Sequence, residues 1–348
     1  MPEPKIEINA TQIIKPYDGS FRVEGEIYEP IELSDVLVVY SVGKEKKYDR
    51  QLIDEAIKLL NRSGERYKIK INQHFCLEVA EHATPEDWIK EVEKDTKENG
   101  KPKFALFVFI EKEKDYYPIL KDHLTYRLEI DSQMFMREKI NPQQKGALKI
   151  AGNIMKQIAA KKNQTLWKIH PIKYYEEKLV LIIGMSVQKM GNKFELVISR
   201  TINKDVSKFR HKIYEIDTRE IPEEFLEQEF YSAMEDYIKF EKRKFKPSTV
   251  VVYRMGLNNE KFVDEHVEKE YAMLKRRVEY ICEHKLKQPY FPELVYIQVT
   301  DKPSQKIWIK EEGNQQGSFL PRVSNPQVGT IMRGMSDNEF YLIPYKAR

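Results

Sequence analysis

The sequence predicts an α/β protein organised in two domains. Apolar, strand-like runs alternate along the chain with amphipathic helical segments, a pattern typical of sheets whose strands are largely buried under helices. At 348 residues the chain exceeds the usual size of one domain, and its 41% of hydrophobic residues are enough for two cores. The stretch around Pro171, between a helical and a strand-like segment, is the predicted border between the domains.

The first domain is predicted to span residues 36–172 and to follow a linker-like segment at 1–35, in which prolines and glycines interrupt short extended pieces. Two apolar runs, DVLVVYS at 35–41 and FALFVFI at 104–110, have the length and composition of buried strands. Apolar residues at helical spacing predict the helices of this domain at 50–62, 85–94 and 143–163.

The second domain is predicted at 173–348 and has a distinct order of elements. Three strands joined at hairpin length are followed by a long helix, a strand, another helix and a last strand. Their ranges are 178–187, 192–202, 209–217, 222–245, 248–255, a helix from about 258, and 293–299. This order is that of the ribonuclease H-like fold, in which acidic residues on the first strand and on the strand after the helix lie side by side and hold metal ions. On order alone, a generic α/β domain is an equal alternative.

Composition limits the compartment and points to one basic segment. The chain has only two cysteines and no apolar run near 20 residues, so we expect an intracellular protein, cytoplasmic or nuclear, with no membrane partner. Lys and Arg number 59 against 55 Asp and Glu, a net charge of +4. Residues 117–173 hold 11 Lys and Arg against 4 Asp and Glu, an excess of +7 (11 − 4), so the rest of the chain sums to −3 (4 − 7). The basic character is therefore concentrated in one segment.

Four stretches of the second half form a distinctive series. They are LIIGMSV at 181–187, KPSTVVVYRMGLNNEKF at 246–262, YFPELVYIQVTDKPSQKIW at 290–308 and NPQVGTIMRGMSDNEFYL at 325–342. In motif, order and spacing this series resembles the Argonaute family, its Piwi branch more than the other. The resemblance implies a Rossmann-like MID domain at 36–172, followed by a truncated ribonuclease H-like PIWI domain at 173–348. It also implies that the family's N-terminal and PAZ domains and its last PIWI segment are missing from this chain.

The resemblance extends to a phosphate site in the first domain. The family's MID domain binds the 5′ phosphate of a guide RNA with a Tyr, a Lys four residues on and a Gln twelve residues later, a spacing matched by Tyr117, Lys121 and Gln133. A helical polar residue followed by Lys four residues later is matched by Gln157 and Lys161. Ammonium groups and amide donors suit a terminal phosphate, and an aromatic face suits the first base.

Each of these residues also has an ordinary interpretation. Taken singly, Lys121 and Lys161 are better explained as solvated helix charges, and Gln133 as an ordinary surface amide. Their joint spacing inside the one basic segment favours the phosphate site. Two departures from the family weaken the expected pocket: Met134 stands where relatives often have a small polar residue or cysteine, and Ala159 where they usually have asparagine.

The family's catalytic carboxylates are not matched in the second domain. The resemblance places Ser186 and Met255 where cleaving members have aspartates, and a hydroxyl and a thioether are poor ligands for Mg²⁺. Glu223 or Glu224 matches a mobile family glutamate to within one residue, but a Glu at a helix start is usually a surface charge. We therefore predict no metal site and no enzymatic activity. At two positions where the family has arginines on the guide backbone, this chain has Lys302 and Lys306.

The expected function is that of a small-RNA guide-binding protein that pairs its guide with complementary target RNA and silences without cleavage, through recruited effector proteins. Two alternatives stay open: an active guide-directed endoribonuclease with unconventional metal ligands, and a protein-interaction scaffold that no longer binds RNA. No cofactor is expected, with Mg²⁺ at the guide 5′ phosphate as the one alternative.

Overall fold

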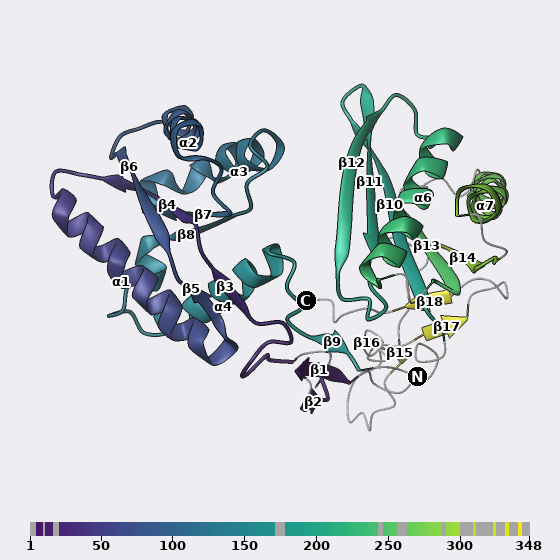
Figure 1. The fold of residues 1–348 in the computed structure, drawn as a ribbon, viewed down its shortest axis with the longest axis horizontal. Helices are drawn as coiled ribbons and strands as arrows, with labels where there is room; N and C mark the ends of the chain where they lie inside the picture. Colours follow the sequence, from purple (N-terminus) through teal and green to yellow (C-terminus); the bar gives the residue numbers. More distant parts are fainter. Residues whose placement is uncertain are drawn as a thin grey trace, which may run out of the picture. The chain divides into compact units, whose positions relative to one another are not determined.

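The computed structural model describes residues 5–9, 11–16, 21–170, 178–242, 246–255, 263–286 and 290–299, together with four short strands between 309 and 342. It divides the chain into two compact units, shown in Figure 1. The N-terminal unit comprises residues 6–14 and 22–170, and the C-terminal unit comprises residues 1–5, 15–21 and 171–348.

The centre of the N-terminal unit is a parallel sheet of four strands in the order β6-β4-β7-β8. The strands are β6 (His74–Ala80), β4 (Val36–Val42), β7 (Phe104–Phe109) and β8 (Ser132–Met136). Every residue of β4 and β7 is buried, as their unbroken apolar runs predict. β8 is an edge strand because it pairs only with β7.

Helices cover both faces of this sheet. Figure 1 shows α2 (Pro85–Asn99) and α3 (Tyr117–Tyr126) on one face, where Trp88 and Leu120 pack into a core with Phe107. The helices α1 (Lys46–Gly64) and α4 (Ala147–Lys161) pack against each other. Short 3₁₀ helices η1 (Glu65–Tyr67), η2 (Glu111–Tyr116) and η3 (Arg137–Ile140) complete the unit.

The N-terminal segment differs from the expected linker. The segment contains strands β1 (Ile6–Asn9), β2 (Gln12–Ile14) and β3 (Ile31–Leu33). β1 pairs with β2 and with β9 (Lys168–Ile169), and β3 pairs with β5 (Ile69–Ile71). Ile6, Ile8 and Ile27 are buried, so isolated apolar residues between turns hold this segment in the unit. The runs are too short for periodicity to reveal them.

The C-terminal unit contains a five-stranded sheet in the order β12-β11-β10-β13-β14. Strands β10 (Val180–Met190), β11 (Lys193–Thr201) and β12 (Phe209–Ile216) are antiparallel neighbours, and β13 (Thr249–Met255) and β14 (Glu293–Gln298) run parallel to β10. This is the ribonuclease H-like order that the sequence predicts.

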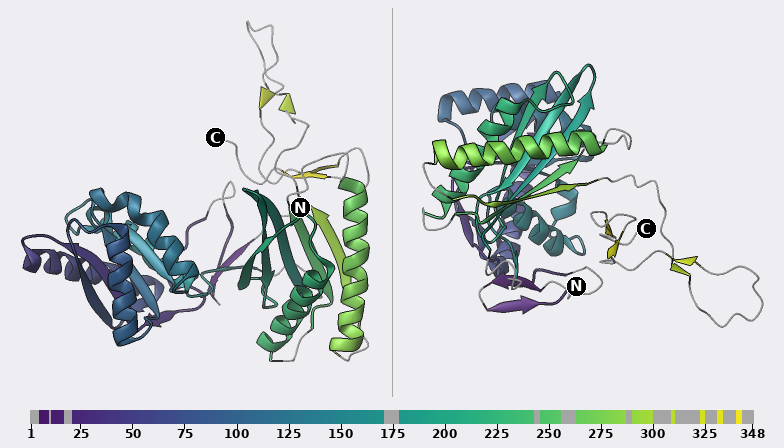
Figure 2. Two further views of the ribbon diagram at one scale, coloured as in Figure 1. Left: turned by 90° about the horizontal axis from the view of Figure 1, so that it is seen from above. Right: turned by 90° about the vertical axis from the view of Figure 1, so that its right-hand side faces the viewer.

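Two helices supply the core of the C-terminal unit. Side chains of α6 (Glu223–Phe240) and α7 (Val263–Tyr280) form one cluster with the sheet, to which Phe230, Leu274 and Ile183 belong. α7 continues into a π-helical turn η4 (Ile281–Lys285). Further along the chain, β15 (Ile309–Lys310) pairs with β16 (Val323–Ser324), and β17 (Ile331–Arg333) pairs with β18 (Phe340–Leu342), as drawn in Figure 2.

A buried ion network fastens α6 to the sheet. Arg200 of β11, 2% exposed, donates to the carboxylates of Glu229 and Asp236 at 2.7 Å each. Lys212 and Tyr214 of β12 also donate to Glu229. Burial raises the pKa of Glu229, but the hydrogen bonds from Lys212, Tyr214 and Arg200 outweigh burial and hold this pKa below its usual value. The network is therefore a charged contact in which both terminal nitrogens of Arg200 have acceptors, whereas its Nε is buried with no hydrogen-bond partner among the described residues.

Candidate functional site

The ammonium groups of Lys121 and Lys161 meet at the first residue of strand β8. Lys121 Nζ donates to the carbonyl oxygen of Ser132 at 3.3 Å and to its Oγ at 3.0 Å. Lys161 Nζ donates to the same carbonyl at 2.6 Å and to Gln133 Oε1 at 2.9 Å. We call Lys121, Lys161, Ser132 and Gln133 the lysine cluster. It joins three of the five side chains predicted to form the phosphate site.

The position of β8 at the sheet edge explains why the lysines meet there. The N–H of Ala105 on β7 donates to the carbonyl of Asp131, and hydrogen-bonding directions alternate along a strand. The carbonyl of Ser132, one residue later, therefore points to the free edge of the sheet. Lys121 reaches it from α3, and Lys161 reaches it from the last residue of α4. The two ammonium groups satisfy a carbonyl that no further strand pairs with.

The cluster concentrates positive charge. Burial lowers the pKa of Lys121. Burial and the neighbouring charge of Lys121 together lower the pKa of Lys161 to about 8, while Asp131 opposes both shifts. Asp131 is itself bound by Lys162, with Nζ and Oδ2 3.0 Å apart. Within the described residues, the atoms that accept from Lys121 and Lys161 are amide, hydroxyl and carbonyl oxygens, none of them a carboxylate.

The other two predicted side chains lie one helical turn from the cluster. Tyr117 precedes Lys121 by four residues on α3, and Gln157 precedes Lys161 by four residues on α4, so each shares a helix face with its lysine. Both side chains are exposed, and that of Tyr117 is 50% exposed. Both side chains are therefore accessible at the surface, one helical turn before the lysine with which each shares a helix.

The two departures from the family pattern lie in the core. Met134 is 8% exposed and packs with the aromatic core beneath α2 and α3, and Ala159 is fully buried on α4. Sequence reasoning missed Ser132, Asp131 and Lys162. Adjacency to Gln133 and Lys161 was the available signal for all three, but only the strand geometry shows that the Ser132 carbonyl joins the two lysines.

In the C-terminal unit, Ser186 of β10 and Met255 of β13 are register partners in the parallel ladder. The parallel ladder thus places Ser186 and Met255 side by side, as the predicted order of the strands requires. Met255 is 40% exposed, whereas the preceding Arg254 is buried and donates to Glu270 of α7. A hydroxyl and a thioether do not fit Mg²⁺, which prefers carboxylate and water oxygens. Among the described residues, no group of three or more His, Cys, Asp or Glu side chains could hold a metal ion.

The remaining predicted positions divide into two groups. Glu223 begins α6 and accepts a hydrogen bond from Arg277 of α7 at 2.9 Å, so its carboxylate has a structural partner. Glu224 is exposed. Lys302 and Lys306 lie outside the described residues.

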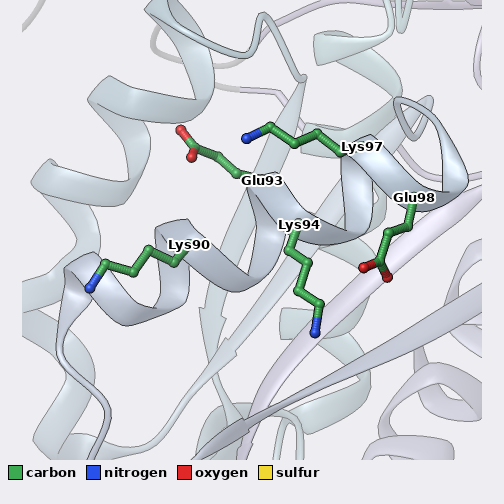
Figure 3. Close-up of a pocket in the computed structure, with 5 residues that line it drawn as sticks. All are labelled: Lys90, Glu93, Lys94, Lys97 and Glu98. Atoms are coloured by element: carbon green, nitrogen blue, oxygen red, sulfur yellow. The ribbon is translucent and has the colours of Figure 1, made fainter.

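A surface hollow runs along α2, and it contains none of the predicted site residues. Figure 3 shows its lining side chains, all from this one helix: Lys90, Glu93, Lys94, Lys97 and Glu98. Three of these side chains are basic and two are acidic, and they project in different directions from the helix. This arrangement is that of a solvated helix face rather than a ligand pocket.

In the described residues, no helix is long and apolar enough to cross a membrane.

The strand order of the two sheets, the register pair of Ser186 on β10 and Met255 at the end of β13, and the lysine cluster together define a protein of the MID–PIWI class. Residues 104–346 match the family model described as the Piwi domain. The chain belongs to this family. Comparison with curated protein sequences gives no match.

Solved structures agree on the fold. Drosophila Piwi matches with a TM-score of 0.72 at 16% identity, over 100% of this chain and 45% of that one. The C-terminal lobe of a budding yeast Argonaute matches with a TM-score of 0.70 at 10% identity, over 96% and 72%. Kluyveromyces polysporus Argonaute, solved with a guide RNA, matches with a TM-score of 0.65 at 9% identity, over 86% and 36%. The chain therefore spans less than half the length of Drosophila Piwi.

Proposed function

We propose that the lysine cluster binds the 5′ phosphate of a guide RNA, and that the chain acts in RNA-guided silencing without cleaving the target. The observation that carries this proposal is the convergence of Lys121 and Lys161 on one carbonyl oxygen, with no carboxylate as acceptor. Two cations held together repel each other unless an anion is present. A terminal phosphate carries about −1.5 to −2 charges and three acceptor oxygens, and it fits this requirement.

The hydrogen bonds leave donors free for such a ligand. An ammonium group has three N–H donors. Lys121 donates to two oxygens of Ser132, and Lys161 donates to Ser132 and Gln133. Each lysine therefore has one N–H left, so a phosphate can bind both without breaking the bonds that position them. Tyr117, one turn before Lys121, offers its exposed ring to the first base.

Recognition of the target then belongs to base pairing between the guide and a complementary RNA. The phosphate anchors the guide end, and its bases stay available for pairing. Met255 and Ser186 support the non-cleaving half of the proposal. Two-metal cleavage of a phosphodiester needs carboxylates to hold the ions, and this register pair supplies none. Silencing would then depend on effector proteins recruited to the complex.

The test compares one RNA sequence with a 5′ phosphate and with a 5′ hydroxyl, by fluorescence anisotropy at fixed ionic strength. Two charge-assisted hydrogen bonds predict that the phosphorylated RNA binds at least about tenfold more tightly. Equal affinities would refute the phosphate site, and no binding of either RNA would favour a protein-interaction scaffold.

A second assay tests the absence of cleavage. The protein, its phosphorylated guide and a labelled complementary RNA are incubated with Mg²⁺ or Mn²⁺. We expect no product. A target cut at one internal position, with the cut abolished by Glu223→Ala and Glu224→Ala together, would show an active endoribonuclease instead.

A further inference from the structure

A buried glutamate lies just before the candidate site. Glu113 belongs to η2, which connects β7 to the helix that carries Tyr117 and Lys121. It is only 2% exposed, which is rare for a glutamate. Its Oε2 accepts from the backbone N–H of Ile110 at 2.9 Å, and its own N–H donates to the Ile110 carbonyl at 2.9 Å. The side chain therefore closes the first turn of η2 on itself.

The same carboxyl group links η2 to the sheet. It lies beside the hydroxyl of Ser41, a buried residue near the end of the central strand β4. Its second oxygen, Oε1, is buried with no hydrogen-bond partner among the described residues. An ionised carboxylate is far more costly in such a place than a neutral acid. Burial accordingly raises the pKa of Glu113, against the effects of Ser41, Ile110 and Arg137, while the nearby Glu138 raises it further.

The end of η2 is anchored as well. The ring of Tyr116 packs edge-on against Trp88 of α2, with ring centroids 6.5 Å apart and planes at 81°. The next residue, Tyr117, is 50% exposed. Since neighbouring residues at a helix start point in different directions, fixing Tyr116 inward determines where Tyr117 points. Glu113 and Tyr116 thus hold the two ends of η2.

We propose that Glu113 is a positioning residue for the guide site, holding η2 so that Tyr117 faces the first base of a guide whose phosphate is bound by Lys121 and Lys161. The inference rests on the proposed function. Glu113 does not itself touch the ligand, because its carboxyl group is buried. Its contribution is to order Tyr117 before the guide arrives, which removes an entropic cost from binding.

The test uses Glu113→Ala, Glu113→Gln and the matched control Asp115→Ala, an exposed acidic residue of the same 3₁₀ helix. The probe is an RNA with 2-aminopurine as its first base, whose fluorescence is quenched by stacking on an aromatic ring. Glu113→Ala should lose most of this quenching and weaken binding of the 5′-phosphorylated RNA by about threefold to tenfold. Glu113→Gln, neutral and of the same shape, should behave as wild type, and so should Asp115→Ala.

Thermal unfolding of each variant checks that it folds. If Glu113→Ala does not fold, Ser41→Ala is used instead, because it removes only the hydroxyl beside the carboxyl group and should reduce the quenching of the 5′ base. Wild-type quenching in folded Glu113→Ala, or in Ser41→Ala in its place, overturns the inference. The proposed function fails separately: in that case wild-type protein would bind phosphorylated and hydroxyl-ended RNA equally.

Discussion

Replacement of Lys161 by alanine tests the lysine cluster most directly. Lys161 Nζ lies 2.6 Å from the carbonyl of Ser132 and 2.9 Å from Gln133 Oε1, which leaves one N–H for the phosphate. A hydrogen bond to a charged group contributes about 1.5–3 kcal/mol, and the partly exposed position reduces this figure. The variant also leaves Lys121 to satisfy the Ser132 carbonyl alone. We therefore expect a loss of about 1–3 kcal/mol, or about fivefold to 150-fold in affinity for the 5′-phosphorylated RNA.

The assay measures the affinity of the wild-type protein and of Lys161→Ala for the 5′-phosphorylated RNA and for the 5′-hydroxyl RNA. Lys161→Ala should weaken binding of the 5′-phosphorylated RNA and leave binding of the 5′-hydroxyl RNA nearly unchanged, because the lost bond needs the phosphate. Lys149→Ala is the matched control, since it removes one exposed charge from the same helix three turns away from Lys161. If Lys161→Ala and Lys149→Ala weaken the binding of both RNAs equally, the reasoning is refuted. Such a result would indicate general attraction to the RNA backbone rather than a phosphate site.

Two further predictions concern the charges of each unit. Binding of the 5′-phosphorylated RNA should be tightest between about pH 6 and about pH 8. Below this range the phosphate loses its second negative charge, and above it unliganded Lys161, whose pKa is about 8, loses its proton. An affinity that stays constant up to about pH 10 would contradict this pKa. In the C-terminal unit, Glu229→Ala leaves buried Arg200 with one carboxylate fewer and should lower the free energy of unfolding by about 3 kcal/mol in urea titrations. The exposed pair of Glu215 with Lys193 is the control, and Glu215→Ala should cost less than about 1 kcal/mol.

Long elements could be predicted from the sequence, whereas short ones could not. β4, β7, β10 and β13 are strands of six residues or more, each built around a run of at least four apolar residues, so composition alone reveals them. β3 and β5 have three residues each, and no periodicity exists over such a length. β6 was missed because its residues are mostly half-exposed and mixed in character. The helices α2 and α6 extend within a few residues of their predicted ranges.

The candidate site shows the same limit at the level of single atoms. The resemblance to the family's MID motif singled out Lys121, Gln133 and Lys161, and the structure joins them by hydrogen bonds. The acceptor that holds the two lysines together is a backbone carbonyl, and its direction depends on β8 being an edge strand. Every residue type carries that carbonyl, so no sequence pattern marks it. Met134 and Ala159 illustrate the converse: the sequence flags them as departures, yet both side chains are buried in the core.

The structure also explains how this fold can dispense with acidic residues at the positions of Ser186 and Met255. Successive side chains of a strand point to opposite faces of the sheet. Met185 is buried in the core with Ile183 and Val252. Ser186 and Met255 lie on the opposite face. Two carboxylates at a register pair repel each other unless cations are bound. Neutral side chains there remove this repulsion and leave the core unchanged. The proposed non-cleaving function is therefore compatible with a stable sheet, because neutral side chains at this register pair need no bound cation.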